Sequence, residues 1–415
     1  MIIQVAKAEL RNLYFSPVAW FLLIAFFVQC ALFYTTPLFG MANWQDIMIK
    51  NNPDYAGNPL MSYTRALFLM NGGFFANVKD NLYLYIPLLT MSLIGREVQN
   101  GTIKLLYSSP LKIRHIVLGK YLAIMIYNLM LVMVIGIFFI TAVLNVKAID
   151  YGMLLSATLG FYLLTCAYTA IGTFMSSLTT YQIVAALGTF MVIFALQMMA
   201  GLWQQYDFVR DLTFFLHLPG RTERMLWGLI TSKDVIYFLV VIAMFVMFTM
   251  LKLRGAREVK PWYVKGARYL AVTAIGLMIG YISSRPVMTL YWDTTEQKVN
   301  TIHDKTQDLL REMSDEPLEV TLYTNFLDGR LYAGLPKARN SYLTNVWEKY
   351  QRFKPDIRFH YEYYYQYDST VMGNHLAKMF PGKTVDQMAQ KLSGYQEIDL
   401  GLFQKSICVQ KVINW

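Results

Sequence analysis

Residues 121–146 read YLAIMIYNLMLVMVIGIFFITAVLNV, a run without a single Asp, Glu, Lys, Arg or His. An α-helix needs roughly 20 mostly apolar residues to cross a bilayer, and this run exceeds that length. A buried helix of a soluble protein is the alternative for one such stretch, so the neighbouring sequence has to decide between the two.

Six further apolar windows flank this run. Their approximate limits are Pro17–Thr36, Asn81–Gly95, Tyr151–Leu178, Gln182–Trp203, Val235–Leu251 and Tyr269–Ser284. Charged residues make up only 15% of the chain, against about a quarter in soluble domains. The first window is too long for a signal peptide and no small-residue cleavage site follows it. The sequence therefore predicts a polytopic α-helical membrane protein with seven spans.

The net charge of +10 does not require a nucleic-acid partner. Basic residues outnumber acidic ones in the first 289 residues, whereas the remaining residues are nearly balanced. Loops between spans account for the excess. The three cysteines, Cys30, Cys166 and Cys408, lack disulfide or metal-ligand spacing and are interpreted as packing residues.

Basic residues concentrate in two short connections between windows. They are Arg96, Lys104, Lys112, Arg114 and Lys120 in the second connection, and Lys252, Arg254, Arg257, Lys260, Lys265 and Arg268 in the sixth. Because cytoplasmic loops collect Lys and Arg, we expect both connections and the N-terminus inside. An odd number of spans then places the residues after about Arg285 outside the cytoplasm.

The first fifteen residues predict a short amphipathic helix in the inner interface. The apolar residues Ile3, Ala6, Leu10 and Leu13 recur at helical spacing, and Lys7, Glu9 and Arg11 are expected on other faces. A frayed extension of the first span is the alternative.

The interiors of the seven windows lack the ionisable residues that ion-coupled transporters and channels keep within the bilayer. The energy for transport is therefore expected from outside the membrane. The fourth window is rich in small and hydroxyl residues, namely Ser156, Gly160, Thr165, Thr169, Gly172 and Ser176. Such residues let helices approach closely, which indicates either a dimer or pathway face or, more simply, packing within one subunit.

The second connection, residues 96–110, reads REVQNGTIKLLYSSP. Thr102 can begin a short helix and Pro110 ends it, with Ile103, Leu105 and Leu106 on an apolar side. Such a segment suits docking into a groove of a partner protein, and an interfacial loop is the alternative.

This region resembles a known family. Glu97 at the end of the second span, Gly101-Thr102, Leu105-Leu106, Pro110 and Gly119-Lys120 are similar to the coupling-helix region of type-two ABC export permeases. Residues 8–17 resemble the N-terminal elbow of that family and residues 228–254 its last span, so the resemblance covers about residues 1–255.

The resemblance implies a six-helix permease core, a homo- or heterodimer of such subunits, and a separate cytoplasmic ABC ATPase. ATP is then used by the partner, no cofactor binds this chain directly, and the chain itself is no enzyme. The coupling residues implied are Glu97, Gly101, Thr102, Leu105, Leu106, Pro110, Gly119 and Lys120. The Glu97 carboxylate is expected to anchor the coupling helix through a basic neighbour or a helix N-terminus.

The tail after the seventh window predicts an α/β domain. Leu318–Thr324 and Ile357–Tyr365 alternate like strands, and Ala338–Phe353 between them is helical, which favours parallel pairing. Asp304 or Thr301 is expected to cap a helix that runs to Met313. Residues 290–365 resemble the auxiliary extracytoplasmic domain of gliding-motility-associated ABC transporter proteins, and we expect this domain to be incomplete at Trp415.

The predicted organisation is an interfacial helix (1–15), a six-span permease domain (16–255), a basic linker with a seventh span (256–289) and an extracytoplasmic α/β domain (290–415). Nothing in the sequence predicts a catalytic or metal site, because the five histidines lack ligand spacing and Gly382-Lys383-Thr384 lacks the first glycine of a phosphate loop. The tyrosine-rich strand at 361–367 is interpreted as packing rather than as a sugar site.

We expect an inner-membrane permease that exports or extracts a substrate. The alternative is a mechanotransmitting or scaffold subunit of a gliding-motility or secretion machine with an extracytoplasmic protein partner.

Overall fold

The computed structural model describes residues 1–52, 63–69, 73–101, 112–146, 149–199, 206–285, 288–313, 317–325, 327, 334–364 and 378–395. The chain divides into two compact units. The first, here called the membrane unit, holds Met1–Gln197 and His217–Asn300, and the second, here called the C-terminal unit, holds Met198–Leu216 and Thr301–Trp415.

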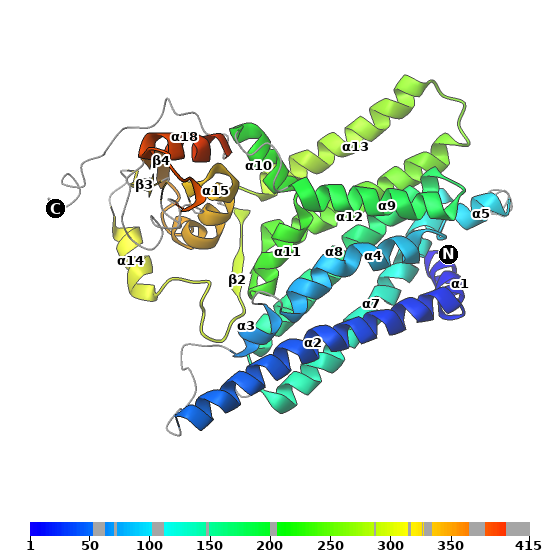
Figure 1. Cartoon of the computed structure of the whole chain (residues 1–415). Coiled ribbons are helices and arrows are strands. Elements are labelled where there is room, and N and C mark those ends of the chain that lie inside the picture. Colours follow the sequence, from blue (N-terminus) through cyan, green and yellow to red (C-terminus); the bar gives the residue numbers. More distant parts are fainter. Residues whose placement is uncertain are drawn as a thin grey trace. The chain divides into compact units, whose positions relative to one another are not determined.

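Five helices of the membrane unit are long and apolar enough to cross a bilayer (Figure 1). They are α2 (Pro17–Asn51), α7 (Ile113–Asn145), α8 (Tyr151–Leu178), α12 (Ser232–Gly255) and α13 (Trp262–Ser283). The two remaining predicted windows overlap shorter helices of 17 residues each, α4 (Phe74–Thr90) and α9 (Gln182–Met198). The described residues thus confirm a polytopic helical membrane protein with five candidate spans rather than seven of full length.

Several helices extend beyond the apolar windows that predicted them. The first window ends at Thr36, but α2 continues to Asn51, and α7 begins eight residues before Tyr121. Polar residues continue a helix once its hydrogen-bond ladder has formed, so hydropathy marks the lipid-facing part and not the helix end. One consequence is that Lys120 belongs to a helix rather than to a loop.

Short elements join the ends of the long helices. They are α1 (Ile2–Tyr14), α3 (Tyr63–Phe68), α5 (Gly95–Gln99), α11 (Leu218–Leu226), β1 (Leu229–Thr231) and β2 (Tyr291–Asp293). The strands β1 and β2 pair antiparallel, with Ile230 opposite Trp292. Gly228, at φ +85°, precedes β1, and a Cβ there would lie 2.4 Å from Thr295 Cγ2. The chain after α13 is therefore held against the start of α12.

Helix α8 lies at the centre of the membrane unit and packs against α4, α7, α11 and α12. Its small residues face neighbouring helices of the same chain: Gly160 lies against Met225 and Gly172 against Thr90. The Ser156 hydroxyl donates to the Met225 carbonyl at 2.8 Å. Packing within one subunit, the simpler of the two interpretations, is confirmed for these residues.

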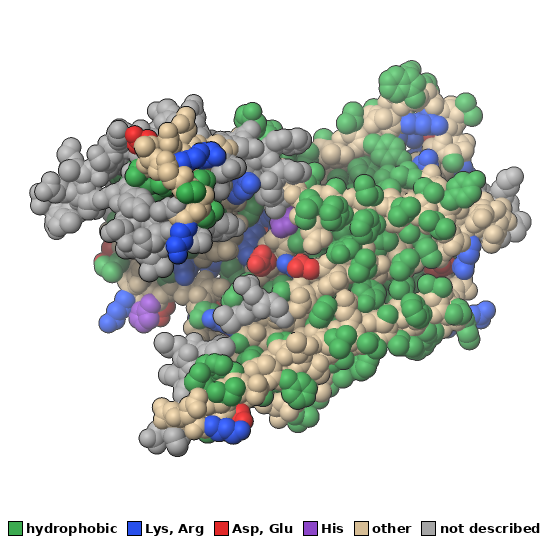
Figure 2. All heavy atoms as spheres, viewed as in Figure 1, with side chains coloured by type: hydrophobic (Ala, Val, Ile, Leu, Met, Phe, Trp, Pro, Cys, Tyr) green, Lys and Arg blue, Asp and Glu red, His purple; other side chains and the backbone are tan. Residues whose placement is uncertain are grey.

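The outer faces of the bundle are apolar, as a bilayer requires. Figure 2 shows hydrophobic side chains spread over the helices of the visible face. Phe21 on α2 is 70% exposed and Leu270 on α13 is 72% exposed. Cys30 and Cys166 are buried free thiols, which confirms their packing role, and Cys408 lies outside the described residues.

The C-terminal unit is a small α/β assembly. Its elements are α10 (Asp207–Leu216), α14 (Asp304–Glu312), β3 (Glu319–Asn325), α15 (Pro336–Tyr342), the π-helical turn η4 (Leu343–Trp347), α16 (Glu348–Gln351), β4 (Arg358–Tyr364) and α18 (Val385–Tyr395). Strands β3 and β4 pair in parallel, with helical turns between them in sequence, so the predicted strand–helix–strand order is confirmed. The tail contacts α10, where Asn340 Nδ2 donates to Asp211 Oδ1 at 3.1 Å.

The structure corrects one prediction for the tail and confirms another. The residue that caps α14 is His303, whose Nδ1 accepts from the Lys305 N–H at 3.3 Å, so the expectation of Asp304 or Thr301 was wrong. The Tyr363 hydroxyl donates to the Gly334 carbonyl at 2.8 Å, and the Arg339 guanidinium lies 3.9 Å from the Tyr361 ring centroid. Packing is therefore confirmed for these two tyrosines.

Candidate functional site

Lys120 is the centre of a buried charge cluster in the second turn of α7. The residue is 2% exposed. Its Nζ lies 3.0 Å from Glu9 Oε2 and 2.8 Å from Glu97 Oε1, and it donates to the Leu93 carbonyl oxygen at 2.9 Å. An ammonium group has three N–H donors, so this one ammonium meets three oxygens, one from α1 and two from the segment between the end of α4 and α5.

Glu9 comes from α1, on the side that contacts α7. It is 8% exposed, whereas Ile3 is 76% exposed. The apolar pattern had predicted that Ile3 faces inward and that Glu9 lies on another face. Glu9 is turned inward because burial of a carboxylate is tolerated where a cation and hydrogen-bond donors meet it. The rest of the inward face follows the pattern, with Ala6 buried and Leu10 and Leu13 packed against the core.

Gly119 permits the close approach of α1 to α7. A Cβ at this position would lie 2.6 Å from Val5 Cβ and 2.9 Å from the Ile2 carbonyl oxygen. Any larger residue would push α1 away from α7 and separate Glu9 from Lys120. Gly119 and Lys120, predicted together from the sequence, thus act on the same contact.

Glu97 lies on α5, the helical turn that follows the end of α4. The turn before it is fixed to α8, because the Ser176 hydroxyl accepts from the Ile94 and Gly95 amides, both at 3.1 Å. The same hydroxyl donates to the Met91 carbonyl at 3.0 Å. Glu97 therefore links Lys120 to a segment already anchored on the central helix.

The connection between α5 and α7 has described residues at both of its ends. Gly101 has a left-handed φ of +71°, a conformation that glycine adopts without strain, and Lys112 precedes α7. The predicted coupling residues Thr102, Leu105, Leu106 and Pro110 lie outside the described residues. The Glu97–Lys120 ion pair therefore joins α5, which precedes the connection, to α7, which follows it.

The cluster is suited to mechanical linkage rather than to chemistry. A buried ion pair adds little net stability, but removal of one partner leaves an uncompensated charge at a cost of about 3–5 kcal/mol. The contacts between α1, α5 and α7 therefore tend to be kept or broken together. Within the part of the chain that the structure describes, no group of three or more His, Cys, Asp or Glu is placed to hold a metal ion.

A second buried cluster, at the start of α12, was not predicted from the sequence. Asp234 is fully buried, and its Oδ1 accepts from Arg221 at 3.0 Å and from Arg224 at 2.6 Å. Its Oδ2 accepts from the Thr231 hydroxyl at 2.6 Å, and the Arg221 guanidinium lies 4.3 Å from the Tyr237 ring centroid. The available signal was the i, i+3 spacing of the two arginines, which places both on one face of α11.

His217 precedes α11 in the same region. Burial, followed by the nearby charges of Lys79 and Arg221, lowers the pKa of His217 to about 4. The imidazole is therefore neutral at physiological pH.

One comparison with known proteins gives a match. Residues 3–207 match the model of a family described as ABC-2 family transporter protein, and this range contains Glu9, Glu97 and Lys120. No curated protein and no solved structure matches the chain. The family has no catalytic activity of its own and implies a partner ATPase subunit. Residues 3–207 therefore form an ABC-2 family transporter membrane domain, and the chain is a multi-pass permease subunit of that type.

Proposed function

We propose that this permease couples ATP hydrolysis by a separate cytoplasmic ATPase to the export or extraction of a substrate, and that the connection between α5 and α7 receives the motion. The observation that carries the proposal is the contact of one buried ammonium, Lys120, with both Glu9 and Glu97. A displacement of the connection pulls on Glu97, and Lys120 passes that displacement to α7 and α1.

The anchoring of α5 supports a path into the bundle. Ser176 ties the turn before α5 to α8, and α8 in turn packs against α4, α7, α11 and α12. A push on α5 is therefore resisted by packed helices rather than absorbed by a free loop, since packed interiors transmit strain.

We propose that the protein lies in the inner membrane of the cell. In the proposed orientation, α1 and the connection between α5 and α7 face the cytoplasm. The basic residues of this connection and of the connection between α12 and α13 support it. Residues 16–255 would then form a six-helix permease core, residues 256–289 a linker with a further span, and residues 290–415 an extracytoplasmic domain. The working unit would be a homo- or heterodimer of such subunits.

The test uses the full chain co-expressed with its partner ATPase and reconstituted in lipid. Glu97→Gln should leave the ATPase bound but abolish the effect of the permease on ATP turnover, because the ion pair between α5 and Lys120 is lost. The matched control is Glu258→Gln, which removes an acid paired with Arg254 and Arg268 on a different connection. Equal permease-dependent turnover in wild type and Glu97→Gln would refute the coupling role.

A second candidate function concerns the C-terminal unit. This unit combines the tail with residues 198–216, which lie in sequence between helices of the membrane unit. Through these residues, motion of the membrane domain could be passed to an extracytoplasmic protein partner, as in a gliding-motility or secretion machine. The family match ends at residue 207 and gives this alternative no support. Affinity capture with the full chain should recover a stoichiometric protein partner that a chain without residues 301–415 fails to recover.

A further inference from the structure

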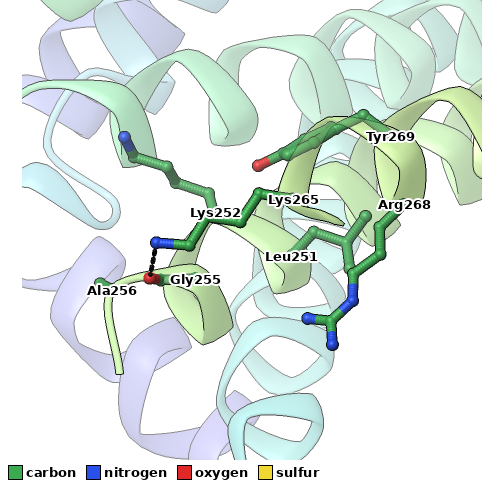
Figure 3. Close-up of a pocket in the computed structure, with 7 residues that line it drawn as sticks. All are labelled: Leu251, Lys252, Gly255, Ala256, Lys265, Arg268 and Tyr269. Carbon is green, nitrogen blue, oxygen red and sulfur yellow. Dashed lines mark hydrogen bonds between the residues drawn. The ribbon is translucent and has the colours of Figure 1, made fainter. Parts of the chain in front are cut away.

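The C-terminal end of α12 and the first turns of α13 enclose a pocket of about 280 Å³. Figure 3 shows the pocket with Leu251, Lys252 and Gly255 from α12 and Lys265, Arg268 and Tyr269 from α13. The lining holds three basic side chains and no acidic one. Because the side chains that line this pocket carry only positive charge, the pocket favours an anionic ligand.

The basic groups retain donors for a ligand. Lys265 Nζ gives one hydrogen bond, to the Gly255 carbonyl at 2.9 Å, and Arg268 Nη1 pairs with Glu258 at 2.9 Å. An ammonium has three N–H donors and a guanidinium five. In the described part of the chain, Lys252 has no acidic partner. These are the groups that hold phosphate in proteins.

The position of the pocket along α13 matches the edge of a bilayer. Trp262 and Tyr263, just before it, are 85% and 62% exposed, and Leu270, just after it, is 72% exposed. Exposed Trp and Tyr gather where the headgroups meet the hydrocarbon, and exposed leucines lie below them. The pocket therefore lies at headgroup depth.

The wall on the hydrocarbon side is apolar. Leu251 and Tyr269 line it, and the Tyr269 ring lies 5.4 Å from that of Phe248 on α12. A second pocket of about 560 Å³ adjoins the other side of α12 and shares Leu251. Its lining combines the apolar Met247 and Met250 with basic residues, including Lys112 and Arg114, and the acidic Glu258. The α12–α13 pocket thus combines basic side chains, which suit an anionic headgroup, with apolar side chains, which suit an acyl chain.

We propose that the α12–α13 pocket binds an anionic phospholipid of the surrounding bilayer, with the phosphate held by Lys252, Lys265 and Arg268. The lipid's acyl chains lie against Leu251 and Tyr269. The enrichment of Lys and Arg in cytoplasmic loops explains why basic residues gather at this end of the spans. It does not explain why they line a concave site with an apolar wall. The inference depends on membrane insertion alone and not on the coupling role of Lys120.

The experiment measures binding of a fluorescent phosphatidylglycerol to the purified full chain in neutral detergent. Unlabelled phosphatidylglycerol should compete, whereas phosphatidylcholine and inorganic phosphate should not. Lys252→Gln/Lys265→Gln should weaken binding by about tenfold or more, since two of the three basic side chains that line the pocket lose their charge. Lys252→Arg/Lys265→Arg should restore binding, and an unfolding midpoint of Lys252→Gln/Lys265→Gln equal to that of the wild type shows that the glutamine variant is folded.

The matched control is Lys7→Gln/Arg11→Gln, which removes two exposed basic residues of α1. An equal loss of binding in this control would mean attraction to the overall positive surface and would overturn the proposal. If inorganic phosphate competes as strongly as phosphatidylglycerol, the ligand of the pocket is a free anion and not a lipid. Unchanged lipid binding together with loss of the partner ATPase in Lys252→Gln/Lys265→Gln would assign the pocket to a protein contact.

Discussion

The Lys120 ammonium lies 3.0 Å from the Glu9 carboxylate, although 111 residues separate them in the chain. This contact fixes the N-terminal helix α1 to the start of α7. The same ammonium pairs with Glu97, so it belongs at once to the N-terminal helix and to the predicted coupling connection. An ABC-2 permease that receives motion at this connection has a direct route to the first helix of its fold.

Replacement of Lys120 by Met should destabilise the membrane unit by about 3–5 kcal/mol, because two largely buried carboxylates lose their cation. Thermal unfolding of the detergent-purified chain should show a lower midpoint. The triple variant Glu9→Gln/Glu97→Gln/Lys120→Met should recover part of the loss, since no buried charge remains. No recovery would mean that packing of the lysine stem, and not charge, holds this site.

Gly119→Ala should loosen α1, because the added Cβ meets Val5 and the Ile2 carbonyl oxygen at distances below 3 Å. Overpacking of this kind costs about 1–3 kcal/mol. Limited proteolysis between α1 and α2 should become faster. Gly136→Ala on the same helix is the control, because nothing lies within 4 Å of a Cβ there, and its cleavage rate should equal that of the wild type.

Asp234→Asn should be among the most damaging substitutions at the start of α12. It leaves Arg221 and Arg224 without their carboxylate in a buried site, at a cost of about 3–5 kcal/mol. Asp46→Asn removes an acid from an exposed pair with Lys50 on α2 and should change the unfolding midpoint little. Similar midpoints for the two variants would contradict the buried role of Asp234.

The free energy of unfolding should fall on acidification, over a pH range set by the pKa values of His217 in the folded and unfolded protein. Its pKa is lowered from 6.5 to about 4 in the folded protein, so between these values the unfolded chain binds more protons than the folded one. The contribution of His217 to stability is therefore fully present above about pH 6.5 and declines as the pH falls toward 4, by about 3 kcal/mol in all. His217→Gln should flatten this part of the curve of unfolding midpoint against pH, and an unchanged slope would assign it to other groups.

Much of the architecture follows from the sequence because the signals involved are local. Each long apolar window predicts its own helix, since a backbone in lipid has to satisfy its hydrogen bonds internally. The Tyr151–Leu178 window coincides with α8, and the tail's alternating segments become β3 and β4 with the expected parallel pairing. The motif from Glu97 to Lys120 also indicated the region of the candidate site without any structure.

The partners of these residues were decided by tertiary structure. Periodicity placed Glu9 away from the core and Ile3 toward it, but the buried ammonium of Lys120 reverses this preference. Arg221, Arg224 and Asp234 converge only because α11 folds back against the start of α12. The sequence by itself therefore determined which segments enter the membrane, through hydrophobicity that acts residue by residue. Only the tertiary structure decided which charges are buried, because burial of a charge depends on a counter-ion supplied from elsewhere in the chain.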